Sequence, residues 1–90
     1  MKPQVPQVTR VQKGSKTVYM ANGKVLRNST KEYKYALFGL LDVEWNPETR
    51  KQEASPLHWN LVGFGNNPTN LVNSWKNIFH CIEFGIATIE

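Results

Sequence analysis

The segment from Tyr33 to Trp45 constrains the fold of this chain more than any other part of its 90 residues. The residues at its odd positions are almost all apolar, which is the period-two pattern of a β-strand with one buried face. The even positions are apolar in the middle, at Ala36, Phe38 and Leu40, and charged towards both ends. A long strand with one fully apolar face and one half-apolar face is predicted to lie near the centre of a sheet.

Two tight turn signals precede this strand, Gly14-Ser15 and Asn22-Gly23. Glycine at the first position suits a type II′ turn, and Asn-Gly suits a type I′ turn, so both pairs favour two-residue β-hairpins. The two turns predict a three-stranded meander over residues 8–28 in which Tyr19 faces Arg10 on one side and Leu26 on the other. The face expected to look inward carries Val11, Val18, Met20 and Val25. The face expected to look outward carries Arg10, Gln12, Thr17, Tyr19, Lys24 and Asn28.

The second half of the chain predicts a return strand, a helix and a last short strand. After a turn at Asn46-Pro47-Glu48, a strand through residue 64 is expected to bulge or break near Pro56. Asn67-Pro68 is a typical helix start, because asparagine caps the first turn and proline fits its first position. A helix over about residues 68–84 is expected, ending at Gly85 and followed by a short last strand at residues 86–89. Its apolar stripe contains Leu71, Trp75, Ile78 and Ile82.

These elements predict an α+β fold: an antiparallel sheet of five to six strands covered by one C-terminal helix. We expect residues 1–6 to form a flexible arm and residues 7–90 a single domain, with Trp75 packed over Gly39 in the central strand. The longest uncharged apolar run, residues 36–41, is much shorter than the ~20 residues that span a bilayer. The N-terminus lacks a signal-peptide pattern and Cys81 is the single cysteine, so a cytoplasmic location without membrane contact is expected.

Charge is distributed unevenly along the chain. Residues 1–34 contain eight Lys and Arg against one acidic residue, a net charge of +7, whereas residues 35–90 carry a net charge of −3. Such asymmetry is typical of a protein that binds a polyanion. The alternative interpretation is that these cations only keep an exposed meander soluble and protect its edge strands from aggregation.

The predicted outward face of the meander combines an aromatic ring with cations. Tyr19 lies between Arg10 and Lys24, so a base of an unpaired strand could stack on the ring while cations meet phosphates. The candidate nucleic-acid-binding residues are Arg10, Lys13, Lys16, Tyr19, Lys24 and Arg27, and a single strand is the favoured ligand. The open alternative is that Tyr19, Val8 and Leu26 form an apolar seam covered by another part of the same chain.

The order of meander, long strand, turn, return strand and Asn67-Pro68-capped helix with a central Trp75 resembles a known type of fold. Over residues 15–80 it is similar to the small sheet-plus-helix domains of single-strand-binding transcriptional coactivators. This resemblance implies single-strand binding. The strand expected after the helix departs from that pattern.

A second hypothesis is that the chain is a protein-interaction module. One helix cannot easily cover both faces of a sheet, so Phe38 and Leu40 on the second face of the central strand are candidate contact residues. A small regulator or inhibitor of the kind encoded by phages and mobile elements would fit this hypothesis, as would a homodimer.

The sequence contains no pattern that predicts catalysis. Asp42 and Glu44 share a strand face but stand beside a turn, where charge usually marks the emergence of a strand into water. His58, His80 and Cys81 have none of the familiar metal-binding spacings, and His80 and Cys81 point apart if they are helical neighbours. We therefore expect no catalytic residues, no metal, no cofactor and no small-molecule substrate, and no enzyme activity.

Overall fold

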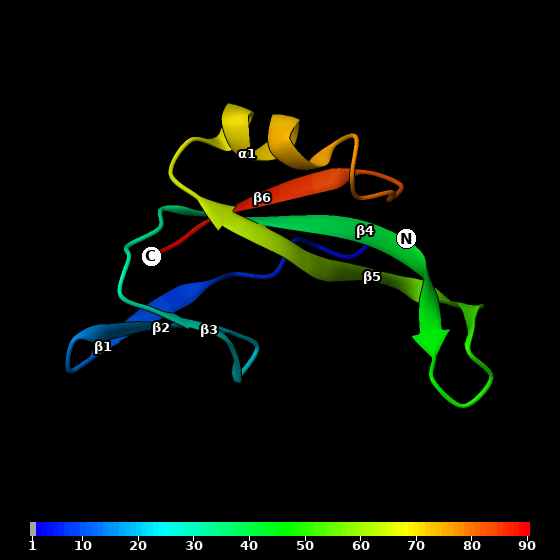
Figure 1. Ribbon diagram of the computed structural model, residues 1–90, viewed down its shortest axis with the longest axis horizontal. Coiled ribbons are helices and arrows are strands. Elements are labelled where there is room, and N and C mark those ends of the chain that lie inside the picture. The colour runs from blue at the N-terminus through cyan, green and yellow to red at the C-terminus, as the bar shows by residue number, and fades with distance from the viewer. Residues whose placement is uncertain (1) are drawn as a thin grey trace.

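The computed structural model describes residues 2–90, which fold into six strands and one helix (Figure 1). In chain order the elements are β1 (Thr9–Lys13), β2 (Lys16–Ala21), β3 (Lys24–Ser29), β4 (Tyr35–Asn46), β5 (Lys51–Gly65), α1 (Pro68–Trp75) and β6 (Phe84–Thr88). All strand pairs are antiparallel. The predicted α+β class, the long central strand, the helix and the last strand are confirmed.

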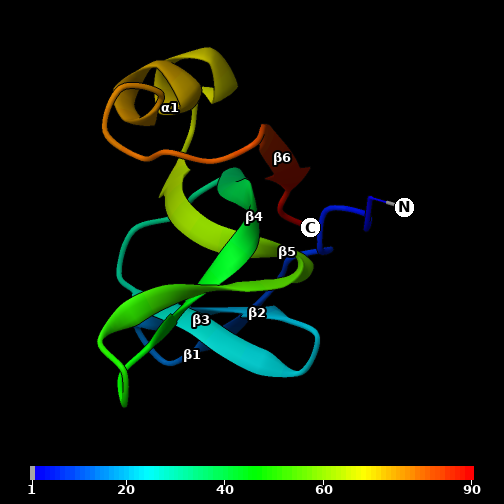
Figure 2. The ribbon, with the colours of Figure 1, turned by 90° about the vertical axis from the view of Figure 1, so that its right-hand side faces the viewer.

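The strands form two sheets of three, with the orders β1-β2-β3 and β5-β4-β6. The sequence predicted one sheet of five to six strands, so the strand count is confirmed but the strands are divided between two sheets. Figure 2 shows the resulting layers: the β1–β3 sheet, the β4–β6 sheet, and α1 on the far side of the latter. The long strand β4 is central in its sheet because it pairs with both β5 and β6.

Both predicted hairpin turns are present. Gly14, Asn22 and Gly23 have φ angles of 61°, 52° and 76°, the positive values that type II′ and type I′ turns require at these positions. The β1–β2 register is the predicted one, with Arg10 opposite Tyr19. The β2–β3 register shifts between Tyr19 and Met20, so Tyr19 faces Arg27 and the predicted pairing with Leu26 is wrong. Leu26 is the additional residue of a β-bulge, a local feature that turn signals do not encode.

The long β4–β5 hairpin is irregular where proline was expected to disturb it. Leu41 pairs with His58 and Val43 pairs with Ala54, so three residues around Pro56 lie opposite Asp42 alone. Proline cannot donate a ladder hydrogen bond, and the bulge accommodates it. Beyond this bulge the two strands continue as a ribbon to the turn at Pro47–Arg50, far from α1 (Figure 1).

The main core lies between the two sheets. Val8 and Tyr19 from the meander side meet Ala36 and Phe38 of β4, and all four are buried. The remaining buried members of this cluster are Ala21, Ala87 and Ile89. Apolar surface of this kind contributes about 25 cal/mol for each Å² removed from water, so this interface is the main stabilising contact of the fold.

Helix α1 and the segment after it cover the opposite face of the β4–β6 sheet through large side chains that approach glycines. A Cβ atom added to Gly63 would lie 2.9 Å from Trp75 Nε1, and one added to Gly39 would lie 2.6 Å from Phe79 Cε1. Trp75 was predicted to lie over Gly39, and that contact is wrong because Phe79 and Cys81 occupy the space above Gly39. The absence of a side chain at these strand positions lets the helical segment approach the sheet closely.

The helix begins as predicted and ends earlier. The side chain of Asn67 accepts a hydrogen bond from the Asn70 backbone N–H at 3.1 Å, and Pro68 is the first helical residue. The helix is only eight residues long, and Gly85 lies within β6 rather than at a helix end. After Trp75 the chain turns back, and Ile82 and Glu83 exchange backbone hydrogen bonds with Leu40 at 2.9 Å. Residues 82 and 83 pair with β4, so they cannot also form the last turns of the helix that the sequence predicted.

Both ends of the described chain contact the sheets. The Trp59 indole N–H donates to the Pro3 carbonyl at 2.8 Å, and Lys2 forms an ion pair with Glu83. Glu90 bonds through its backbone to Val8, which precedes β1, and to Arg10 of β1, at 3.3 Å and 3.2 Å. The C-terminal residues therefore connect the β4–β6 sheet to the meander. No helix within residues 2–90 is long and apolar enough to cross a membrane.

Candidate functional site

Tyr19 lies in the core and not on the surface. Its exposed fraction is 0%, and its ring centroid is 5.1 Å from that of Phe64 and 5.9 Å from that of Tyr33. Its hydroxyl group donates to the Lys31 carbonyl at 3.1 Å and accepts from the Tyr33 backbone N–H at 2.8 Å. The prediction of Tyr19 as a stacking platform for a base is therefore wrong, and the predicted alternative of a covered apolar seam with Val8 is correct.

The face of the meander that meets the other sheet is the one predicted to look outward, although Val18 of the opposite face is also buried, at 7% exposure. Thr17, Tyr19 and Ala21 of β2 are buried and face the other sheet. Val11 and Val25 face outward, with exposed fractions of 47% and 57%. Tyr19 can occupy the core because its ring buries a large apolar area while both hydrogen-bonding capacities of its hydroxyl group are used.

The six predicted nucleic-acid-binding residues therefore do not lie on one face. Lys13 and Lys16 face each other across the β1–β2 turn and share the outward face with Val11, because directly paired residues project to the same side. Arg10 of β1 and Arg27 of β3 both pair with Tyr19, so they lie on the same face as Tyr19, one at each edge of the meander. Lys24, paired with Ala21, also lies at the β3 edge. All five cations are nonetheless exposed to solvent.

Arg27 makes a contact of its own. Its guanidinium carbon lies 5.3 Å from the ring centroid of Tyr33 and 5.8 Å from that of Phe64. A guanidinium group at this distance is attracted to the negative face of an aromatic ring, so the Arg27 side chain is held beside Tyr33 and Phe64. Arg27 thus has a structural contact as well as an exposed charge.

None of the cations of the meander is neutralised by a carboxylate. Within residues 2–90 the only ion pair joins Lys2 to Glu83, outside the meander. Seven further cations between residues 10 and 34 are exposed, and the one acidic residue among them is Glu32, which is also exposed. These seven are Arg10, Lys13, Lys16, Lys24, Arg27, Lys31 and Lys34. Unpaired cations gathered at one end of a molecule create a positive potential that attracts polyanions.

The residues predicted for protein contact are also buried. Phe38 has an exposed fraction of 3% because it belongs to the core between the two sheets, and Leu40 has an exposed fraction of 2%. The prediction of Phe38 and Leu40 as an exposed contact surface is wrong. The large apolar side chains that are exposed lie elsewhere: Val11, Val25, Trp45, Leu57, Ile78 and Ile82.

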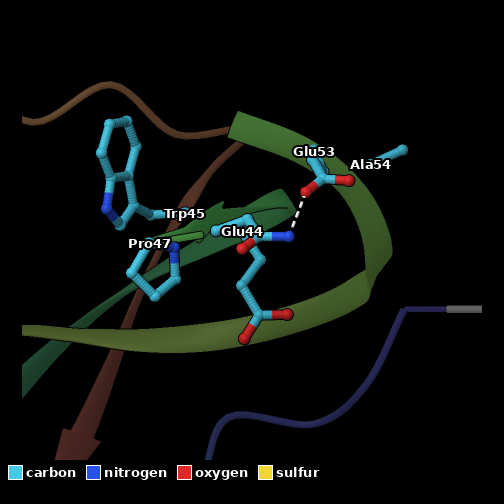
Figure 3. A pocket seen from close by; sticks show the side chains of 6 residues that line it. Glu44, Trp45, Pro47, Glu53 and Ala54 are labelled. Atoms are coloured by element: carbon cyan, nitrogen blue, oxygen red, sulfur yellow. Dashed lines mark hydrogen bonds between the residues drawn. The ribbon is translucent and has the colours of Figure 1, made fainter. Parts of the chain in front are cut away.

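A cavity of 380 Å³ lies beside the β4–β5 turn, between Trp45, Pro47 and the paired residues Glu44 and Glu53 (Figure 3). Glu53 accepts hydrogen bonds from the Asn46 side-chain amide and from the Thr49 hydroxyl, the latter at 3.2 Å. These bonds fix the turn, so Glu53 has a structural role. No group of three or more acidic, histidine or cysteine side chains that could hold a metal ion occurs in residues 2–90.

Cys81 and His58 each make short-range contacts with nearby backbone carbonyl groups. The Cys81 thiol donates to the Glu83 carbonyl at 3.4 Å, and burial raises its pKa although a backbone hydrogen bond at Leu40 acts in the opposite direction. His58 Nδ1 lies 2.9 Å from the Pro56 carbonyl oxygen and 3.4 Å from the Ser55 hydroxyl. A raised thiol pKa disfavours the nucleophilic thiolate.

One concave surface was missed by the sequence analysis. Leu41, Val43 and Trp45 of β4 form the floor of a groove of 660 Å³, with Ile78 and His80 on its wall. The signal was present in the odd positions of the central strand, whose apolar face continues to Trp45. A helix of 17 residues was expected to cover that face, and the observed helix has eight.

No known protein family, no curated protein and no solved structure matches this chain. The geometry and chemistry of the chain itself are therefore the basis for any functional proposal.

Proposed function

We propose that this protein is a non-catalytic nucleic-acid-binding domain that contacts the phosphate backbone through its cationic meander, β1–β3. The observation that carries the proposal is the group of seven exposed cations between residues 10 and 34, none of which pairs with a carboxylate. A cation already neutralised by a carboxylate would gain little from a phosphate. Unpaired cations can displace the condensed counterions of a nucleic acid, which favours binding through entropy.

The shape of the meander supports contact with phosphates rather than with base edges. Lys13 and Lys16 stand side by side at the tip of the β1–β2 hairpin, next to a two-residue turn. This hairpin lies at one end of a molecule that measures 41 Å along its longest axis (Figure 1). Lysine is a flexible point charge that meets phosphate oxygens without strict geometry, so the binding is expected to be independent of sequence.

The preference for a single strand no longer has a structural argument behind it. That preference depended on stacking of a base on Tyr19, and this ring is buried. The proposed contact is therefore with the phosphate backbone, which single and double strands share. A duplex carries its charges more densely along the axis, so it is expected to give the steeper salt dependence.

The test is fluorescence anisotropy with a labelled duplex and the corresponding single strand, titrated at several salt concentrations. The logarithm of the association constant should fall linearly with the logarithm of salt concentration, with a slope of about −0.9 per phosphate contacted on the duplex. The variant Lys13→Glu/Lys16→Glu should bind more weakly and should reduce the magnitude of that slope by about two units, since two phosphate contacts are lost.

The matched control is Lys51→Glu/Lys76→Glu, which makes the same change in net charge at two exposed positions outside the meander. If the meander is the binding surface, this control should retain the salt slope of the natural chain. Equal loss of affinity in both double variants would mean that only net charge matters. That outcome, or an absence of binding at low salt, would contradict the proposal.

A second candidate function is contact with another protein through apolar surface. One observation favours it: Trp45 and Ile78 are exposed by 58% and 69% on the same groove. Large exposed apolar side chains that gather at a concave surface are characteristic of interaction sites. This groove involves the β4–β5 ribbon and the segment after α1, and none of the meander cations lines it.

A further inference from the structure

We propose that Arg27 is a fixed phosphate-binding residue that sets the orientation of a nucleic-acid backbone on the meander. This inference rests on the nucleic-acid binding proposed above and names the side chain that gives that binding a defined geometry. Within residues 2–90 the guanidinium of Arg27 is held against two aromatic rings, a contact that no other cation of the meander makes. Contacts to phosphates fix the orientation of a protein on a nucleic acid, and a planar guanidinium suits this role.

Arg27 stands at the β3 edge of the meander, where the two sheets meet. It pairs with Tyr19, so its side chain leaves β3 on the face that looks towards the β4–β6 sheet. Its guanidinium carbon lies 5.3 Å from the ring centroid of Tyr33, in the link between β3 and β4, and 5.8 Å from that of Phe64 in β5. These two centroids are 5.6 Å apart. Arg27 therefore rests on a pair of aromatic rings, and it is still exposed to solvent.

The protein does not use the hydrogen-bond donors of the Arg27 side chain. Within residues 2–90 no carboxylate lies at ion-pair distance from its guanidinium, and that group donates no hydrogen bond. Contact with the rings attracts the cation without consuming an N–H donor. A guanidinium has five such donors in a rigid plane, and two of them can meet two oxygens of one phosphate. The donors of Arg27 are therefore available to a phosphate.

The aromatic support of Arg27 is itself fixed in place. The Tyr33 backbone N–H donates to the Tyr19 hydroxyl at 2.8 Å. The Asn66 side chain, directly after β5, accepts from the Lys34 backbone N–H at 2.9 Å and donates to the Glu32 carbonyl at 3.3 Å. Three successive residues of the link are thus bonded to side chains of other segments. A guanidinium on such a support loses less conformational freedom on binding than a lysine in open solvent.

Further cations lie next to this support. Lys31 and Lys34 are exposed and belong to the same link, and Glu32 is the single acidic residue between them. In Figure 1 the link and the β1–β2 turn lie towards the same end of the molecule. A backbone bound at Arg27 can therefore extend along a surface whose other charges are mostly positive.

Arg10 provides an internal comparison. It also pairs with Tyr19, so the two arginines share one face of the meander and stand at its two edges. Both are exposed, and within residues 2–90 neither pairs with a carboxylate. In the same part of the chain Arg27 has aromatic contacts and Arg10 has none. The two positions differ in the feature on which the inference depends.

The test is the charge-conserving variant Arg27→Lys, measured by anisotropy with the labelled duplex and single strand described above. Lysine keeps the charge but lacks the planar set of donors. The association constant at fixed salt should fall by about three- to tenfold, the loss expected when a flexible side chain must be ordered on binding. The salt slope should not change, because the number of phosphate contacts stays the same. Arg10→Lys should lose clearly less affinity, and Arg50→Lys, outside the meander, should bind as the natural chain does.

A second pair of variants tests the aromatic support. Tyr33→Leu removes one ring beside Arg27 without a change of charge and should weaken binding by a similar factor, whereas Tyr33→Phe keeps the ring and should lose less. The double variant Arg27→Lys/Tyr33→Leu should bind no more weakly than either single variant, because both changes remove the same contact. Circular dichroism and urea denaturation check that each variant folds. If Tyr33→Leu does not fold, the comparison of Arg27→Lys with Arg10→Lys decides the matter.

Two outcomes would overturn the inference. One is an equal affinity of Arg27→Lys and Arg10→Lys at every salt concentration. The other is a loss of stability in Arg27→Lys with no loss of affinity, which would mean that the guanidinium only closes the edge of the core. In both cases a reduced salt slope in Lys13→Glu/Lys16→Glu would leave nucleic-acid binding through the meander intact. An absence of binding by the natural chain at low salt would instead contradict both proposals.

Discussion

At the residue scale, the hydroxyl group of Tyr19 joins the meander to the start of β4. It bonds to the backbone of Lys31 and Tyr33, which belong to the link between β3 and β4. The ring below it packs against Tyr33 and Phe64. A single side chain therefore fixes the position of a connecting segment relative to both sheets.

Tyr19→Phe tests this role directly. The substitution keeps the ring in the core but removes the partner of the Tyr33 backbone N–H and of the Lys31 carbonyl. A buried backbone group left without a partner costs about 1–3 kcal/mol. Lys31 is exposed, so water can replace the partner of its carbonyl, and the free energy of unfolding should fall by about 1–3 kcal/mol, mainly through the Tyr33 N–H. Urea denaturation followed by tryptophan fluorescence measures the change.

Tyr35→Phe is the matched control for this prediction. Tyr35 loses the same hydroxyl group, but no hydrogen bond of that group occurs within residues 2–90, so its free energy of unfolding should change by less than that of Tyr19→Phe. Equal values for the two variants would show that the Tyr19 hydroxyl contributes no more than a solvent-exposed one. That result would contradict the role assigned to it.

At the element scale, local turn chemistry was the most predictable part of the fold. Asn22-Gly23 and Gly14 determine two hairpins, because few residues accept their positive φ angles, and the β1–β2 register follows directly. The bulge at Tyr19 was not predictable, since it depends on how Leu26 and Arg27 pack against the other sheet. The changed orientation of the meander has the same origin: Val11 of β1 and Tyr19 of β2 lie on opposite faces, and tertiary packing decides which face meets the other sheet.

The candidate site was predictable only in part, for a related reason. Charge composition identified the exposed cations of the meander, because lysine and arginine are rarely buried without a partner. Phe38 and Leu40 could not be assigned to the core from sequence, since their burial depends on a second sheet that the pattern did not reveal. The Trp45 groove was missed because the helix was expected to extend to about residue 84 and in fact ends at Trp75.

The segment after α1 depends on Gly39, which provides space for it. A Cβ atom at this position would lie 2.6 Å from Phe79 Cε1 and 3.1 Å from Cys81 Sγ. In Gly39→Ala both side chains must move, and overpacking of this kind costs about 1–3 kcal/mol. The free energy of unfolding measured in urea should fall by that amount, because the segment is displaced from β4.

A double-mutant cycle with Phe79→Leu checks the cause of that loss. Leucine removes the ring atom nearest to the new methyl group, so Gly39→Ala should cost less in the Phe79→Leu background. If the two effects simply add, the clash with Phe79 is not the reason for the loss. A general effect of alanine on strand β4 would then explain the result.

At the scale of the whole molecule, backbone hydrogen bonds near the C-terminus join the two sheets. Ile89 donates to the Lys34 carbonyl at 2.8 Å, and Glu90 then pairs with Val8 and Arg10 at the start of β1. The Ile89 side chain is buried in the core between the sheets, with an exposed fraction of 8%. The two residues after β6 therefore bond to the backbone next to β4 in one sheet and at the start of β1 in the other.

Ile89→Ala should reveal whether this connection makes the two sheets one cooperative unit. Removing most of a buried isoleucine side chain costs about 2–5 kcal/mol, so the free energy of unfolding should fall by that amount. If the sheets are coupled, hydrogen exchange should accelerate by a similar factor in β2 of one sheet and in β4 of the other, because both open in the same global transition. Val25→Ala, at an exposed position of the meander, should change exchange in neither strand. Accelerated exchange in β2 alone would mean that the meander unfolds separately, and that the β4–β6 sheet stays folded without the contact between the two sheets.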